Sequence, residues 1–235
     1  MSTFDLAKTQ ILATLFAESR EARDDAWRAN FYDAAVNASL MSFDPPVQLG
    51  PDQFPYFQVA IPDAGAFTPF SVSYLLDTVL QNGQGIAIFG DSSRANGPQW
   101  VFTYGNLLSF RLFGSFEGDP AELAKQTAAS TGGGTHSVLV AAPSENYLPS
   151  YARRAIGNYA RRFFQMPHPQ MALVDDPQGT PPRVLMINLT LADYHGDQRK
   201  LGAAMHYLSW FMPQTYRIVP MPPGWKVDGS FVALE

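Results

Sequence analysis

The sequence contains no cysteine, so disulfide bridges, thiolate nucleophiles and cysteine-based zinc or iron–sulfur sites are excluded. Charged residues are also scarce. They make up 16% of the 235 residues, against 46% hydrophobic residues, which favours a packed globular chain over a disordered one. No stretch approaches the roughly 18 consecutive apolar residues that a membrane-spanning helix needs.

Positive charge is limited as well. The formal net charge is −5, so nucleic acid is not expected as a partner. Seven basic and 14 acidic residues precede the glycines near residue 132, and nine basic and seven acidic residues follow them, giving charges of −7 and +2. We therefore expect the two halves to attract each other.

The first residues, MSTFDLAKTQILATLFAESRE, lack the basic start and the cleavage site of a signal peptide. Their composition predicts a helix instead. The expected location of the chain is therefore the cytoplasm.

The first part of the chain mixes predicted helices and strands. A helical segment over residues 4–40 is expected to divide at the charged patch 18–25, with Asp24 or Asp25 capping its second piece and with Pro45 and Pro46 ending it. The patterns that follow predict strands at 56–62, 85–90, 99–104 and 107–114, a turn at Gly105–Asn106, and helices at 71–83 and 120–129.

The second part alternates between the two types of element. Strands are predicted at 137–142, 170–175, 183–191 and 215–220, with helices at 148–165 and 198–212. This βαββαβ order is typical of a ferredoxin-like split βαβ fold. The fold class expected is α+β, with two α/β domains at 1–131 and 137–235 joined by a glycine-rich linker at 132–136.

The helix at 148–165 has two distinct faces. One arc carries its apolar residues, and the opposite arc carries Arg153, Arg154, Arg161 and Arg162. These four arginines are the predicted binding surface, either for an acidic partner or for the acidic first half of the chain.

Several strings together resemble the enhanced serine sensitivity (SseB-like) family of uncharacterised bacterial proteins. They are FYDAAVNASLMSFDPP (31–46), GIAIFGD followed by WVFTYGNLLSF, and VLVAAPSENYLPSYARRAI (138–156). The similarity lies in the layout of the elements and covers most of the chain. It implies a two-domain α/β cytoplasmic protein and assigns no catalytic residues.

A second resemblance concerns IAIFGDSS (86–93), which looks like the first block of GDSL-type hydrolases, with Ser92 as the nucleophile. That family also needs a histidine three residues after an aspartate, and none of the four histidines has this spacing. His195 comes nearest, two residues after Asp193. The simpler interpretation is a strand that ends in an Asp/Ser turn.

No metal or cofactor site is predicted. Asp193, His195, Asp197 and His206 match no metal-binding spacing, and Asp197 is expected to cap the helix that follows it. TGGGT (131–135) lacks the residues of a phosphate-binding loop and is interpreted as a linker.

These observations lead to two functional hypotheses. The first is a non-enzymatic interaction or regulatory protein with a protein partner, and self-association is left open. The alternative is a small GDSL-like serine hydrolase that uses Ser92 and His195.

Overall fold

The computed structural model describes residues 5–63, 70–122, 138–176, 179 and 181–235. The chain divides into two compact units, Met1–Thr103 and Tyr104–Glu235. The predicted linker at 132–136 lies outside the described residues, and so does most of the helix predicted at 120–129. The division falls some 30 residues before that linker because the segment after Thr103 packs within the second unit.

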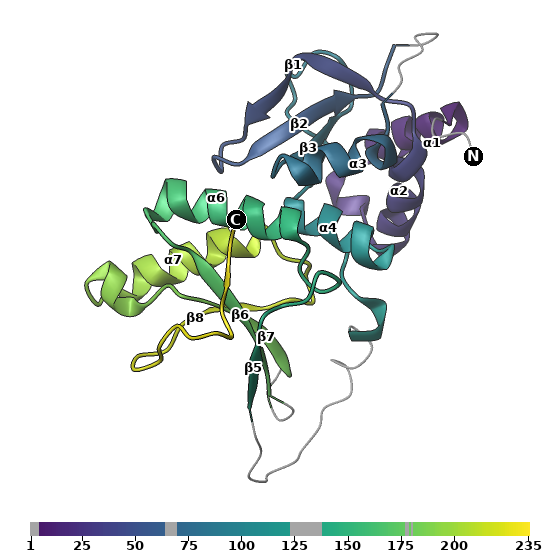
Figure 1. The fold of residues 1–235 in the computed structure, drawn as a ribbon. Coiled ribbons are helices and arrows are strands. Elements are labelled where there is room, and N and C mark those ends of the chain that lie inside the picture. Colours follow the sequence, from purple (N-terminus) through teal and green to yellow (C-terminus); the bar gives the residue numbers. More distant parts are fainter. Residues whose placement is uncertain (1–4, 64–69, 123–137, 177–178, 180) are drawn as a thin grey trace. The chain divides into compact units, whose positions relative to one another are not determined.

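The first unit begins with two helices, α1 (Leu6–Ala17) and α2 (Asp25–Asn37), with the short 3₁₀ helix η1 (Arg20–Ala22) between them (Figure 1). The predicted division at the charged patch is therefore confirmed. Asp24 caps α2, since its Oδ1 accepts a hydrogen bond from the Trp27 amide at 2.8 Å.

The sheet of the first unit has four strands in the order β1-β2-β3-β4, and Figure 1 labels the first three of them. The strands are β1 (Met41–Leu49), β2 (Pro55–Ala60), β3 (Gly85–Phe89) and β4 (Trp100–Phe102). Helix α3 (Val72–Gln81) connects β2 to β3, which pair in parallel, whereas the other two pairs are antiparallel. All five residues of β3 are buried, as its continuous apolar run indicates.

Pro45 and Pro46 do not end the helical segment. Helix α2 ends earlier, at Asn37, and both prolines lie within the edge strand β1. They fall where the register of β1 against β2 shifts, between Ser42 and Val47. Proline is tolerated there because bulged residues of an edge strand need not donate to the ladder.

The strand predicted at 107–114 is wrong, because these residues belong to helix α4 (Tyr104–Phe113). Its fully buried residues Tyr104, Leu107 and Leu108 have the i, i+3, i+4 spacing of a helix face. The turn predicted at Gly105 is absent too. Gly105 donates its amide to the Trp210 carbonyl at 3.0 Å, and a Cβ at this position would lie 2.0 Å from the Met212 carbonyl oxygen.

The second unit contains the predicted order of helices and strands. After α4, its elements are β5 (Leu139–Ala141), α6 (Ser150–Phe164), β6 (Gln170–Asp175), β7 (Arg183–Ile187), η2 (Leu191–Tyr194), α7 (Gln198–Ser209), β8 (Ile218–Pro220) and β9 (Val232–Ala233). The structure is thus α+β, with mixed sheets in both units.

The strand pairing differs from that of a ferredoxin-like split. In a split βαβ unit the two strands joined by a helix are parallel and another strand lies between them. Here β5 and β6, which α6 joins, are adjacent and antiparallel, and the sheet order is β5-β6-β7-β8. The sequence pattern shows where strands and helices occur but is the same for both pairings.

Strand β7 is shorter than predicted. It ends at Ile187 because the next residue, Asn188, turns its side chain to the backbone: Oδ1 accepts from the Gln170 amide at 2.7 Å and Nδ2 donates to the His168 carbonyl at 2.9 Å. Met186 in β7 is 2% exposed, so the sheet face on which it lies is covered at this position.

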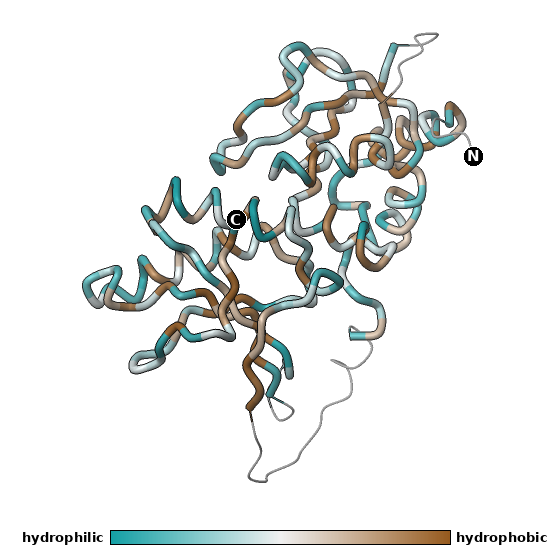
Figure 2. The backbone as a smooth tube through the Cα atoms, viewed as in Figure 1, coloured by the Kyte–Doolittle hydropathy of each residue, from teal (hydrophilic) through white to brown (hydrophobic). Residues whose placement is uncertain are grey.

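Strand β5 lies at one edge of this sheet and carries exposed apolar side chains; Leu139 is 67% exposed. Figure 2 shows this edge as one of the most hydrophobic segments of the second unit. With three residues, β5 offers few backbone groups to another chain. Among the described residues, no helix has the length and apolar character needed to cross a membrane.

Candidate functional site

Ser92, the nucleophile of the hydrolase alternative, lies in an exposed turn after β3. The neighbouring Asp91 serves this turn, since its Oδ1 accepts from the Ser93 amide at 2.8 Å and from the Ser93 hydroxyl at 2.5 Å. These hydrogen bonds lower the pKa of Asp91. The local structure is therefore the Asp/Ser turn of the simpler interpretation.

His195 belongs to the other unit and ends η2 in the left-handed conformation, with φ 52°. The carboxylates beside it are engaged locally. Asp193 Oδ2 accepts from the amide and the hydroxyl of Thr190, both at 2.7 Å, and Asp197 caps α7 as predicted. Within the part of the chain that the structure describes, no group of three acidic or histidine side chains could hold a metal ion.

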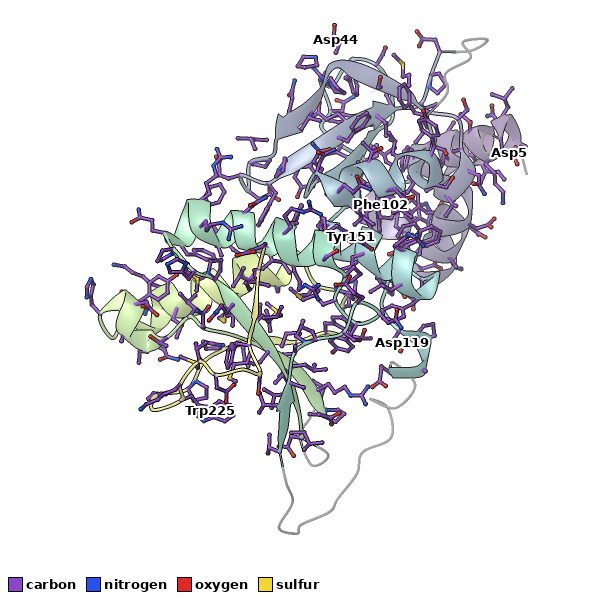
Figure 3. All side chains as sticks on the ribbon, in the orientation of Figure 1. Asp5, Asp44, Phe102, Asp119, Tyr151 and Trp225 are labelled. Carbon is purple, nitrogen blue, oxygen red and sulfur yellow. The ribbon has the colours of Figure 1, made fainter. Side chains whose placement is uncertain are left out.

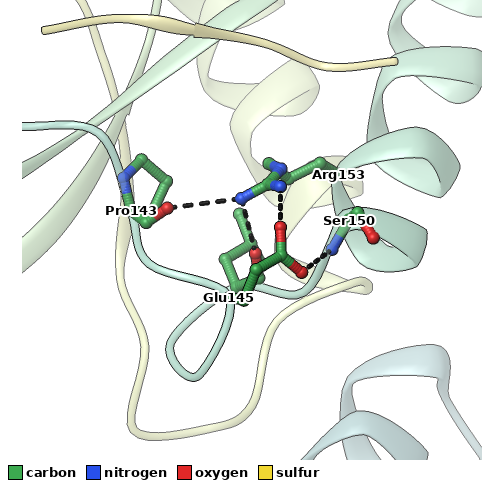
Figure 4. A network of polar contacts seen from close by, with 5 residues as sticks. Pro143, Glu145, Ser150 and Arg153 are labelled. Carbon is green, nitrogen blue, oxygen red and sulfur yellow. Dashed lines mark hydrogen bonds and ion pairs between the residues drawn. The ribbon is translucent and has the colours of Figure 1, made fainter.

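Among the four predicted arginines, Arg153 turns back into its own unit. It forms an ion pair with Glu145 and donates to the carbonyl oxygens of Pro143 at 3.3 Å and Leu148 at 3.1 Å (Figure 4). Glu145 also accepts from the Ser150 amide at 2.8 Å, and this bond is the main reason why its pKa is lowered. Only 14% of the Arg153 side chain is exposed, so it fixes the loop before α6.

The other three arginines of α6 lie nearer the surface. Arg154 and Arg162 are exposed. Arg161 donates to Asn158 Oδ1 at 3.0 Å, and the Arg162 guanidinium lies 5.1 Å from the centroid of the Phe163 ring. The binding role of these three residues stays a prediction.

A pocket of about 220 Å³ in the second unit, which we call the tyrosine pocket, was not predicted from the sequence. It is lined by Phe113, Asp119, Glu122, Ser144, Asn146, Tyr147, Pro181, Pro182, Arg183, Thr215 and Tyr216. These residues come from the end of α4, the loop after it, the loop before α6, the start of β7 and the turn before β8.

The aromatic wall of the tyrosine pocket is built around two stacked rings. The ring centroids of Tyr147 and Tyr216 are 4.2 Å apart and their planes differ by 6°. The Tyr216 hydroxyl donates to the Tyr147 carbonyl oxygen at 2.9 Å, and Phe113 meets the Tyr216 ring edge-on at 6.1 Å. Both tyrosines are half-buried, so the wall is held in place and still reaches the opening.

Local structure positions both tyrosines. The Tyr147 amide donates to the Ser144 carbonyl at 3.0 Å, inside the loop that the ion pair of Arg153 fixes. The Tyr216 amide donates to the Pro213 carbonyl at 2.8 Å in the turn that enters β8. The stack is therefore supported from both sides by backbone hydrogen bonds.

Asp119 brings a carboxylate to the pocket from the loop that follows α4 (Figure 3). Its amide donates to Thr215 Oγ1 at 3.2 Å, and the preceding Gly118 has φ 119°, a conformation that other residues rarely adopt. Oδ1 accepts from the Ala121 amide at 2.9 Å. Among the described residues, Oδ2 has no hydrogen-bond partner.

Arg183 is the one basic residue of the pocket lining, and it forms an ion pair with Asp175. Its Nε donates to Asp175 Oδ2 at 2.9 Å across the β6–β7 pair, and this bond raises the pKa of Arg183. Glu122 adds a second carboxylate to the lining. The charged groups at the pocket are therefore predominantly acidic.

Burial and the neighbouring charges keep both phenols protonated. Burial raises the pKa of Tyr147 to about 12, with Glu122 and Asp175 adding to the shift and Arg183 opposing it. Burial also raises the pKa of Tyr216, with smaller contributions from Tyr147 and Asp119. The pocket thus presents neutral aromatic faces beside carboxylates.

A second cavity in the same unit, of about 440 Å³, is lined by residues 164–168, 188, 189, 193 and 194. Its polar groups are mostly committed: Asp193 binds Thr190, and Asn188 binds the backbone of 168 and 170. Among the buried polar atoms of this lining, the Tyr194 hydroxyl has no partner within the described residues. The tyrosine pocket combines aromatic faces with carboxylates and is therefore the stronger candidate for a binding site.

Sequence reasoning missed the tyrosine pocket for a physical reason. Tyr147 and Tyr216 are 69 residues apart, and neither belongs to a motif. The signal that the sequence offers is weak: each tyrosine lies in a short segment with prolines, Tyr147 just before a helix and Tyr216 just before a strand.

Comparison of the chain with protein-family models, curated proteins and solved structures gave no match. The resemblance to the SseB-like family therefore stays a prediction. The functional argument below rests on the geometry of the described residues.

Proposed function

We propose that this chain is a non-enzymatic interaction protein that holds one side chain of a protein partner in the tyrosine pocket. The observation that carries the proposal is the stacked, half-exposed pair Tyr147 and Tyr216 at the wall of that pocket. Tyrosine is enriched at protein interfaces because it offers a large apolar face and a polar tip with little conformational freedom to lose.

The size of the pocket supports a side chain as the occupant. Its volume of about 220 Å³ is below the roughly 300–1,000 Å³ of sites that enclose a drug-sized ligand or a cofactor. A single long side chain fills such a space, and the rest of the partner then covers the rim.

The wider parts of the proposal come from the sequence. They are a regulatory role in the bacterial cytoplasm, a relationship to the SseB-like family, and a division of the chain into two separate domains. No observation among the described residues favours the hydrolase alternative. Ester hydrolysis that is lost on Ser92→Ala would nevertheless revive it.

The test is selection of a random displayed peptide library on the full-length protein. We expect enriched peptides to bind the wild type and Tyr207→Ala, an exposed tyrosine of α7 outside the pocket. Tyr216→Ala should weaken binding by about tenfold or more, as loss of an interface anchor does.

Tyr216→Phe guards against a folding defect, since it keeps the ring stack and is expected to keep most of the affinity. The proposal is overturned if no peptide is enriched, or if Tyr216→Ala, melting as the wild type does, binds every enriched peptide unchanged.

A further inference from the structure

Building on the proposed function, we infer that the tyrosine pocket recognises a positively charged peptide side chain, and arginine in preference to lysine. The first observation is the unpaired carboxylate oxygen. Asp119 uses Oδ1 to cap the next segment, while Oδ2 has no partner among the described residues. A cationic donor supplies the missing hydrogen bond and neutralises the charge.

The second observation is the balance of charge around the aromatic wall. Asp119 and Glu122 both line the pocket, and Arg183, the basic residue of the lining, forms an ion pair with Asp175. A cation is therefore favoured there. An acidic or phosphorylated side chain would face two carboxylates and would share the guanidinium of Arg183 with Asp175.

The third observation is the aromatic wall itself. The Tyr147–Tyr216 stack is flat, with 6° between the ring planes, and both phenols remain neutral at physiological pH. A cation over such a ring is attracted by its electron-rich face. Cation recognition thus uses both features of the site, the ring faces and the carboxylate.

Arginine fits this combination better than lysine. A planar guanidinium stacks on an aromatic face and at the same time directs a fork of donors at a carboxylate. An ammonium is a compact, strongly hydrated charge that gains less from the flat wall. The other unit also places a guanidinium beside an aromatic ring: Arg23 lies 4.8 Å from the Trp27 ring centroid and donates to two oxygens of Gln99.

The experiment measures fluorescence anisotropy of labelled peptides that share one sequence and differ at a central residue: arginine, lysine, citrulline or glutamate. Citrulline is the matched control because it keeps the shape of arginine without its charge. We expect the arginine peptide to bind tightest and the citrulline peptide to bind about tenfold more weakly.

Two protein variants locate the effect. Asp119→Asn removes the charge but leaves a good capping residue, so the fold is retained and affinity for the arginine peptide should fall about fivefold. Asp197→Asn makes the same change at the N-cap of α7, outside the pocket, and should leave affinity unchanged.

The outcomes separate this inference from the proposed function. Binding that depends on Tyr216 but is equal for arginine and citrulline, or tighter for glutamate, overturns the cation preference and leaves the proposed function standing. Free arginine amide that binds as tightly as the peptide overturns the peptide partner. Absence of any binding that depends on Tyr216 defeats both proposals.

Discussion

In the first unit the aromatic rings of Trp27, Phe31 and Phe102 are 4%, 0% and 0% exposed, whereas in the second unit Tyr147 and Tyr216 remain half-buried at the wall of a pocket. Phe31 stacks on Trp27 at 5.2 Å and lies 4.5 Å from Trp100, so its cluster holds α2 against the sheet. The tyrosine stack faces an opening instead.

The comparison shows that a surplus of aromatic residues has two uses in one chain. Buried clusters such as that of Phe31 stabilise the fold, while a supported but half-exposed stack is available to a ligand. Composition cannot separate the two uses, because the difference lies in what covers each ring.

The largest expected effect is on stability in the first unit. Phe31→Ala removes a fully buried ring from the aromatic cluster and should cost about 3–5 kcal/mol. Tyr216→Ala, at the half-buried wall, should cost less than half as much. Chemical denaturation of both variants measures this contrast, and equal losses would show that the tyrosine stack is core.

Two helical glycines of the second unit sharpen the contrast between covered and open positions. A Cβ at Gly157 in α6 would lie 1.8 Å from the Leu234 carbonyl oxygen, so Gly157→Ala should destabilise the protein by about 1–3 kcal/mol. At Gly202 in α7 a Cβ meets nothing within 4 Å, and Gly202→Ala should stabilise by about 0.4–1 kcal/mol. Thermal melts that shift in the same direction would contradict this account.

Helix caps are expected to contribute alike in the two units. Asp24→Ala in the first unit and Asp197→Ala in the second each remove a side chain that accepts hydrogen bonds from the backbone at a helix start. Each change should lower the free energy of unfolding by about 1 kcal/mol. Urea denaturation checks both values. A loss of stability at only one of the two sites would mean that, at the other site, water satisfies the helix-start amides as well as the aspartate does.

The last expected effect appears only at alkaline pH. The pKa of Tyr147 is raised to about 12 in the folded chain, while an unfolded tyrosine titrates near 10. The folded state therefore holds this proton longer, so its contribution to stability is full below pH 10 and is lost as the pH rises to about 12. Tyr147→Phe should weaken this fall in alkaline denaturation, and an unchanged profile would count against the assignment.

Much of the fold could be predicted from local signals. The charged patch 18–25, with Asp24 or Asp25 as the expected cap, predicted the break between α1 and α2, and the apolar run at 85–90 predicted the buried strand β3. Asp197 was recognised as a cap from its position before α7. These features depend on neighbours in sequence.

The errors have a common cause, because contacts between residues that are distant in sequence determine the features that were predicted wrongly. Strand pairing in the second unit, the helix at 104–113 and the prolines within β1 all depend on distant partners. The candidate site was missed for the same reason, since Tyr216 reaches Tyr147 across 69 residues.

The central claim is that the partner binds at the tyrosine stack and not at the aromatic cluster of the first unit. An NMR titration of the full-length chain, labelled in its tyrosine rings and assigned with Tyr→Phe variants, tests it with the arginine peptide. The account predicts saturable shifts of the Tyr147 and Tyr216 signals, while those of Tyr32 and Tyr56 in the first unit stay in place. Shifts confined to Tyr32 and Tyr56, or saturation of binding with Tyr147 and Tyr216 unmoved, would contradict it.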